Sequence, residues 1–154
     1  MSFKPDANIQ KVAEAYANDA VDFARNLFKV QLDWTEQSIE KVESVLAIMH
    51  QKTLTDKPTE EQIYDFAKGF GSYIGEVYRR LHGGEWGIVT LEGEQFPGMS
   101  TKTGVEFWPW GRVQNRIVDG AENNVWHYYQ LLLPESAGLY AVEKKSFWKR
   151  ITGT

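Results

Sequence analysis

The pattern of apolar residues changes at Gly83-Gly84, and this change constrains the fold more than any other feature of the sequence. Before it, large apolar residues recur every three or four positions, which is the spacing of amphipathic helices. After it, short runs rich in β-branched and aromatic residues alternate with turn residues, which is typical of strands. The two halves predict an α+β domain, in which three N-terminal helices pack with a small, mostly antiparallel sheet and two short C-terminal helices.

Three helices are expected before residue 83. A second helix follows Asp33 or Thr35, either of which can cap it. Thr59 and Gln62 match the capping-box pattern and predict the start of a third helix, which Gly83 ends. The first helix is expected to bury one stripe, made of Val12, Tyr16, Ala20, Phe23, Leu27, Val30 and Trp34.

The third predicted helix contains Gly69, Gly71 and Gly75, although each interior glycine costs about 1 kcal/mol relative to alanine. Ala67, Gly71, Gly75 and Tyr78 form a strip of mostly small residues at the border of its apolar face. We expect this strip to pack closely against another helix or the sheet. Alternatively, the strip is the floor of a ligand pocket.

In the second half, strands are predicted at 85–91 and 105–108, with a turn at Gly93 and a break at 96–98. Pro109 favours the start of a short helix. This helix is expected to bury Trp110, Val113 and Ile117 and to expose Arg112, Gln114, Asn115 and Arg116. Asn123 or Asn124 then caps a last helix.

Residues 1–133 are therefore expected to form a single domain. The segment 134–154 differs in character because basic residues surround Phe147 and Trp148. It is predicted to be a separate basic and aromatic tail, which adds an edge strand or docks as an arm on an acidic surface.

The charge of the chain bears on its partners. Seventeen Lys and Arg residues against 21 Asp and Glu residues leave a net charge of −4, which disfavours nucleic acid and favours a basic partner. The N-terminal residues lack the form of a signal peptide, and no run reaches the ~20 apolar residues of a membrane helix. We expect a cytoplasmic protein that binds neither nucleic acid nor membranes.

The sequence lacks the motifs of the common enzyme classes. It has no cysteine and only three histidines, and it contains no nucleophile elbow, phosphate-binding loop, dinucleotide fingerprint or zinc-protease motif. We expect neither a metal nor a cofactor. His50 and His127 are interpreted as structural or surface residues.

Charged residues concentrate around the end of the third predicted helix, and this cluster is the first candidate binding site. It consists of Glu76, Arg79, Arg80, His82 and Glu85. Glu76 and Arg80 are spaced for an ion pair on an exposed helix face, and the basic residues complement the helix C-terminus. An enzyme would need Glu76 to converge with His82 or Glu85.

The second candidate is aromatic. Five of the six tryptophans lie after residue 85, and most of these aromatic residues are expected to pack against the sheet. Trp108, Trp110 and Arg112 form the stretch that we expect to be an exposed anchor, because tryptophan and arginine are enriched at protein interfaces.

A run of motifs over residues 60–133 resembles small bacterial domains of uncharacterised function, which are similar to the immunity proteins of interbacterial toxin systems. The motifs are Ile74-Gly75-Glu76-Val77, His82-Gly83-Gly84-Glu85-Trp86, Phe107-Trp108-Pro109, Val113-x-x-Arg116-Ile117, Asp119-Gly120 and Val125-Trp126-x-Tyr128-Tyr129. The resemblance implies a bacterial protein that occludes a cognate toxin, and it carries no catalytic residues over to this chain.

We therefore expect a non-enzymatic protein that binds another protein, with a basic toxin domain as the partner that the resemblance implies. Two alternatives remain open at the level of sequence. One is a small-molecule binding module with an aromatic pocket, and the other is an enzyme that uses Glu76, His82 and Glu85.

Overall fold

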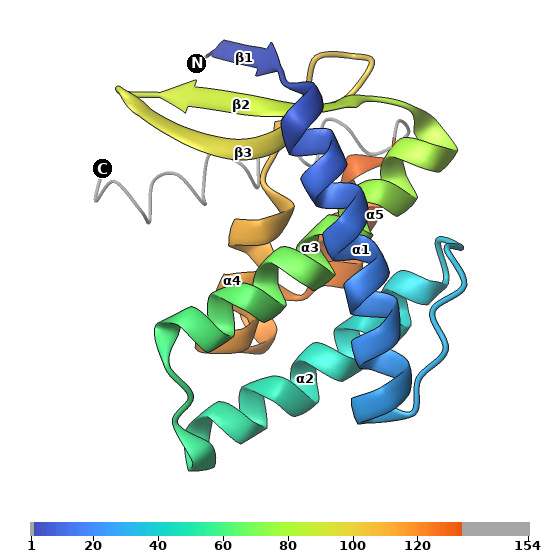
Figure 1. Ribbon diagram of the computed structural model, residues 1–154, viewed down its shortest axis with the longest axis vertical. Helices are drawn as coiled ribbons and strands as arrows, with labels where there is room; N and C mark the ends of the chain where they lie inside the picture. Colours follow the sequence, from blue (N-terminus) through green and yellow to red (C-terminus); the bar gives the residue numbers. More distant parts are fainter. Residues whose placement is uncertain (1, 134–154) are drawn as a thin grey trace.

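The computed structural model of this chain describes residues 2–133. Within these residues, five α-helices and a four-stranded antiparallel sheet form an α+β fold, which confirms the predicted fold class (Figure 1). The elements, in chain order, are β1 (Ser2–Pro5), α1 (Ala7–Phe28), α2 (Ser38–Asp56), α3 (Glu60–His82), β2 (Glu85–Leu91), β3 (Glu94–Ser100), β4 (Glu106–Phe107), α4 (Pro109–Asp119), a 3-10 turn (Ala121–Asn123) and α5 (Val125–Leu132). The tail predicted at 134–154 lies outside the described residues.

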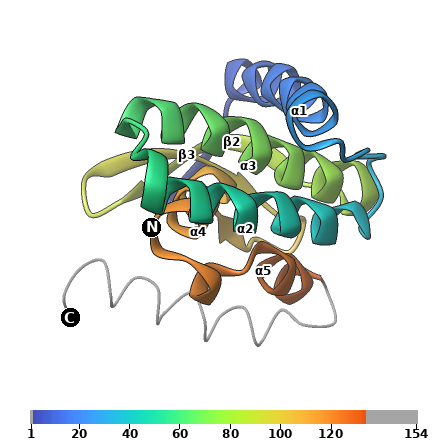
Figure 2. The same cartoon turned by 90° about the horizontal axis from the view of Figure 1, so that it is seen from below.

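The helix α3 is the centre of the fold. Figure 2 shows it between α1 on one side and α4 and α5 on the other. Its N-terminus has the predicted capping box, because the Thr59 side chain accepts a hydrogen bond from the Gln62 amide and the Gln62 side chain accepts one from the Thr59 amide. Gly83 ends the helix with φ +81°, a conformation that favours glycine. These boundaries confirm the sequence prediction.

The helix α1 buries a different stripe from the one predicted. Its fully buried residues are Ala13, Ala17, Ala20 and Ala24, whereas Val12, Phe23 and Leu27 stay 40%, 38% and 60% exposed. The alanines face α3, so the two helices approach more closely than large side chains would allow. Of the predicted stripe, only Ala20 is fully buried.

The segment after α1 also differs from the prediction. The helix ends at Phe28 rather than near Trp34, because Lys29 adopts a left-handed conformation and the Val30 amide returns to the Ala24 carbonyl oxygen at 2.9 Å. The turn that follows holds the start of α2 through Thr35, whose hydroxyl accepts a hydrogen bond from the Ser38 amide at 3.2 Å.

The four strands are ordered β1-β2-β3-β4. The strand β1 was not predicted, and the break predicted at 96–98 is wrong because these residues lie inside β3. Pro97 is tolerated there because β4 pairs only with Met99 and Ser100, which leaves β3 without a neighbour on its second edge at Pro97.

Pro109 starts α4 as predicted. The predicted core residues Trp110, Val113 and Ile117 are all buried. The exposure predicted for Arg112 and Arg116 is wrong, since they are only 6% and 4% exposed. Asn124 caps α5 by accepting a hydrogen bond from the His127 amide at 2.9 Å.

Candidate functional site

The glycine strip of α3 packs closely and does not form the floor of a pocket. A Cβ atom on Gly71 would lie 2.8 Å from backbone atoms of Pro109 and Trp110. A Cβ atom on Gly75 would overlap the Trp86 ring and lie 2.8 Å from the Met99 sulfur. Both glycines therefore bring α3 against α4 and the sheet, as one of the two interpretations of the sequence predicted.

Glu76 is the most deeply buried charged residue of the candidate cluster, with no exposed surface. Arg79 holds its carboxylate through two hydrogen bonds of 2.7 and 2.9 Å, and the Trp86 indole N–H donates a third at 2.9 Å. Arg80, the partner predicted from spacing, is farther away at 3.5 Å. The predicted exposed ion pair is thus a buried one, and its main partner is Arg79.

The protonation of Glu76 follows from these contacts. Burial disfavours the charged carboxylate, but the hydrogen bonds from Arg79 and Trp86 and the nearby guanidinium groups outweigh burial and hold the pKa of Glu76 below its ordinary value. Glu76 is therefore an anion that joins α3 to β2 at neutral pH. Because its acceptors are occupied by side chains of the same chain, its arrangement suits a structural role.

His82 turns away from Glu76 and meets Glu36, which precedes α2. The Nε2 atom of His82 hydrogen-bonds to the Glu36 carboxylate, and the Tyr129 hydroxyl donates to the same oxygen at 3.0 Å. Burial, followed by the Glu36 charge, raises the pKa of Tyr129. Sequence reasoning missed Glu36, since it lies 46 positions from His82.

Glu76 does not converge with His82 or Glu85, which was the condition for an enzyme. Glu76 is bound by Arg79 and Trp86, His82 by Glu36, and Glu85 lies exposed at the start of β2. An imidazole and a carboxylate do meet at His82 and Glu36, but their side chains remain 26% and 34% exposed. This pair links the end of α3 to the segment before α2.

Arg80 contributes to a neighbouring aromatic contact. Its guanidinium lies 3.9 Å from the centre of the Trp34 ring, and Trp34 packs on Tyr73 with ring centres 4.8 Å apart. The Tyr73 hydroxyl accepts a hydrogen bond from the Trp34 amide at 2.9 Å and is 2.6 Å from the Ser38 hydroxyl. These contacts fasten the segment between α1 and α2 to α3.

The exposed anchor predicted at Trp108, Trp110 and Arg112 is wrong. The three residues are 8%, 7% and 6% exposed. The Trp110 indole N–H donates to the Ser72 hydroxyl at 2.7 Å, and the Arg112 guanidinium covers the Tyr128 ring at 4.2 Å. Because the segment is used to pack α4 against α3 and α5, it offers little surface to a partner.

A second buried ion pair was not predicted. Arg116 on α4 donates three hydrogen bonds of 2.8 to 3.0 Å to Glu43 on α2. Glu43 also accepts a hydrogen bond from the Val125 amide at 3.0 Å, so one carboxylate joins α2, α4 and the start of α5. Their separation of 73 residues leaves no local sequence signal for the pair.

One group of exposed apolar and aromatic side chains lies along α1 and α3. We call it the α1–α3 strip, and it consists of Tyr16, Phe23, Leu27, Tyr64 and Phe66. The Phe23 and Phe66 rings meet edge to face at 5.5 Å, and the Lys68 ammonium bridges the Tyr16 and Tyr64 rings at 5.3 and 5.0 Å. Leu27, Tyr64 and Phe23 are 60%, 40% and 38% exposed.

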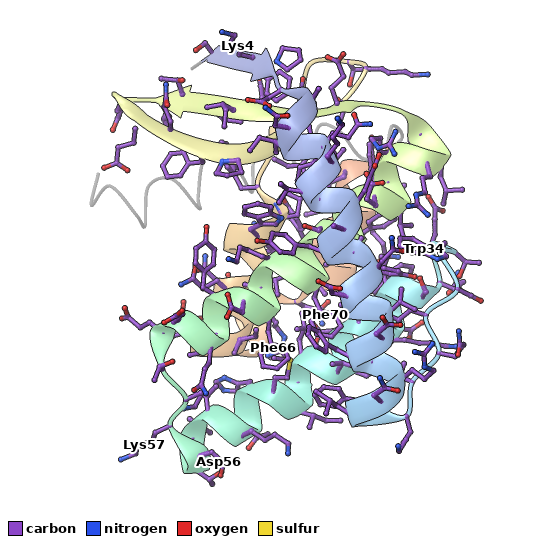
Figure 3. All side chains as sticks on the ribbon, in the orientation of Figure 1. Lys4, Trp34, Asp56, Lys57, Phe66 and Phe70 are labelled. Atoms are coloured by element: carbon purple, nitrogen blue, oxygen red, sulfur yellow. The ribbon has the colours of Figure 1, made fainter. Side chains whose placement is uncertain are left out.

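A pocket of about 310 Å³ adjoins this strip where α1 and α2 end and α3 begins. Leu27 and Phe66 belong to both features. Figure 3 shows Phe66 on the side of α3 toward α2, with Asp56 and Lys57 at the end of α2. The residues that line the pocket are Leu27, Phe28, Met49, Lys52, Thr53, Asp56, Pro58, Gln62, Ile63, Phe66 and Ile117.

Metal-ligating side chains do not gather anywhere in residues 2–133 in a group of three or more that could hold an ion. None of the helices in this part of the chain is both long and apolar enough to cross a membrane. The chain matches no protein-family model, no curated protein and no solved structure. The resemblance to small bacterial domains therefore stays a prediction.

Proposed function

We propose that this protein works by binding another protein, and that the α1–α3 strip is its contact surface. The observation that supports this most is the choice of the buried face of α1: the helix buries its alanines and leaves Phe23 and Leu27 at the surface. Contiguous exposed apolar and aromatic residues are typical of protein interaction sites. The charged residues predicted as a site are, by contrast, engaged mainly within the fold.

The charge of the domain favours a basic partner. Residues 1–133 contain 13 Lys and Arg residues and 19 Asp and Glu residues, so their net charge is −6. Asp19 and Asp65 are exposed on the same two helices as the strip, and Asp65 offsets the charge of Lys68, with which it pairs at 3.3 Å. An apolar centre with acidic residues beside it complements a partner surface that has an apolar anchor surrounded by Lys and Arg.

In its more specific form, the proposal assigns the protein to the bacterial cytoplasm as an immunity protein that occludes a basic toxin domain. The resemblance over residues 60–133 supports this form, and so does the acidic charge. Occlusion requires no catalytic group on this chain. The product of the adjacent gene is the first partner to test.

The test combines capture of a partner with matched variants. The tagged full chain is co-purified from its own cells, and its affinity for the partner is then measured by calorimetry. Tyr64→Glu in the strip should weaken binding by at least tenfold, since it replaces an exposed aromatic ring of the contact surface with a charge. Leu81→Glu, on the same helix and 51% exposed, should bind as the wild type does.

The same experiment can refute the proposal. The variants are compared with the wild type only after far-UV circular dichroism and thermal unfolding have established that they are folded. If no protein partner is found, or if Tyr64→Glu binds the partner as tightly as Leu81→Glu, the α1–α3 strip is not the contact surface.

A further inference from the structure

We propose that the pocket between the ends of α1 and α2 and the start of α3 binds an uncharged aromatic molecule of about two rings, with one hydrogen-bonding group at the mouth. The pocket shares Leu27 and Phe66 with the α1–α3 strip, but the ligand is inferred from the pocket's own size and lining and not from the proposed protein contact. It also lies away from the glycine strip, where the sequence had suggested a pocket.

The size of the pocket sets the size of the ligand. Its volume is about 310 Å³, at the lower end of the range of small-molecule sites. An engineered apolar cavity of ~150 Å³ holds one benzene molecule. A pocket of twice that volume fits two fused or linked rings.

The walls favour an aromatic ligand. Phe28 and Phe66 supply rings to the lining, and aromatic pairs in offset or edge-to-face geometry are more favourable than their buried area alone accounts for. Met49 is 8% exposed and supplies a thioether, which also contacts rings favourably. Ile63 and Ile117 complete an apolar interior.

The polar lining residues indicate a ligand without net charge. Lys52 and Asp56 both line the pocket, and their charges cancel. Two further polar groups are already used within the chain, since the Thr53 hydroxyl donates to the His50 carbonyl and the Gln62 side-chain oxygen accepts from the Thr59 amide. A ligand with one hydroxyl or amine can hydrogen-bond to Lys52 or Asp56 at this rim without bringing a net charge against the apolar walls, which would be costly.

The first experiment uses the unmodified full chain and 1-naphthol as the probe. The chain contains three methionines, of which Met49 lines the pocket and Met99 lies in the core beside Gly75. With ¹³C-methyl-labelled methionine, the Met49 signal should shift saturably as naphthol is added, because the ring current of the ligand acts at short range. The Met99 signal should stay in place.

A variant that fills the pocket provides the second experiment. Ile63→Trp should reduce the affinity for 1-naphthol at least tenfold, whereas Leu81→Trp adds the same side chain to an exposed position outside the pocket lining and should leave the affinity unchanged. The proposal is overturned if the Met49 signal does not move, if Met49 and Met99 move equally, or if a folded Ile63→Trp protein binds as the wild type does. Since the methyl experiment needs no substitution, it decides the question even if Ile63→Trp fails to fold.

These results are distinguishable from those of the proposed protein contact. Tyr64 does not line the pocket, so Tyr64→Glu should leave naphthol binding intact. Loss of partner binding in Tyr64→Glu with retained naphthol binding would support both proposals. If the experiments refute one of the two proposals, the other is still supported by its own results.

Discussion

Alanine substitutions at Gly69 and Gly71 should change the stability in opposite directions, although both residues lie inside the same helix. A Cβ atom on Gly69 would lie 3.7 Å from its nearest neighbours, the Ala20 side chain and the Tyr16 carbonyl oxygen, which is an ordinary contact. Alanine there gains helix propensity without a clash. We expect Gly69→Ala to raise the free energy of unfolding by about 0.5–1 kcal/mol.

At Gly71, the same methyl group would meet the carbonyl carbon and oxygen of Pro109 and the Cα of Trp110, all at 2.8 Å. These are backbone atoms, so they cannot rotate aside, and α4 would have to move away from α3. Overpacking costs about 1–3 kcal/mol, which exceeds the gain in helix propensity over most of this range. We expect a net loss of about 1–2 kcal/mol in Gly71→Ala, which corresponds to a fall in Tm of about 2–8 °C.

Urea unfolding followed by tryptophan fluorescence measures both effects, and an unchanged m-value shows that the same surface unfolds in each variant. The close approach of α3 and α4 predicts that Gly69→Ala is more stable than Gly71→Ala by about 2 kcal/mol. If Gly71→Ala is as stable as the wild type or more so, the contact between α3 and α4 is not the reason for this glycine.

Two further predictions concern Glu76. Glu76→Gln should lower the free energy of unfolding by about 2–4 kcal/mol, because it removes the anion that Arg79 binds in a buried site; a change below about 1 kcal/mol in urea unfolding would contradict this. The folded-state pKa of Glu76 lies below its ordinary value of 4.5, so its stabilising contribution is complete above that pH and is lost as the pH falls through the lower folded-state pKa. Stability measured below pH 4.5 should therefore fall less steeply in Glu76→Gln than in the wild type, and equal slopes would contradict the pKa direction.

The elements that sequence reasoning placed correctly depend on local chemistry. Thr59 and Gln62 satisfy each other's backbone amides within one turn, Gly83 adopts a conformation that other residues avoid, and Pro109 lacks the amide that a first helical turn leaves unused. Such signals act over a few residues. They can therefore be recognised without knowing how the rest of the chain packs.

The candidate site was harder to predict, since its contacts depend on burial and on distant segments. Helical spacing allows Glu76 to pair with either Arg79 or Arg80. In the folded protein Arg79 is the closer partner, and the same carboxylate oxygen also accepts a hydrogen bond from Trp86. Glu36 reaches His82 only because the segment before α2 folds back on α3. No pattern within a short window encodes such a contact.

By itself, the sequence determined where α3 begins and ends and where α4 begins, because the capping box, Gly83 and Pro109 act through their own backbone. The tertiary structure decided which side of α1 is buried. Periodicity marks both the alanine stripe and the stripe of large residues as candidate faces, and the larger residues bury more apolar area. The alanines face α3, where small side chains on α1 let the two helices pack closely, and this leaves Phe23 and Leu27 outside.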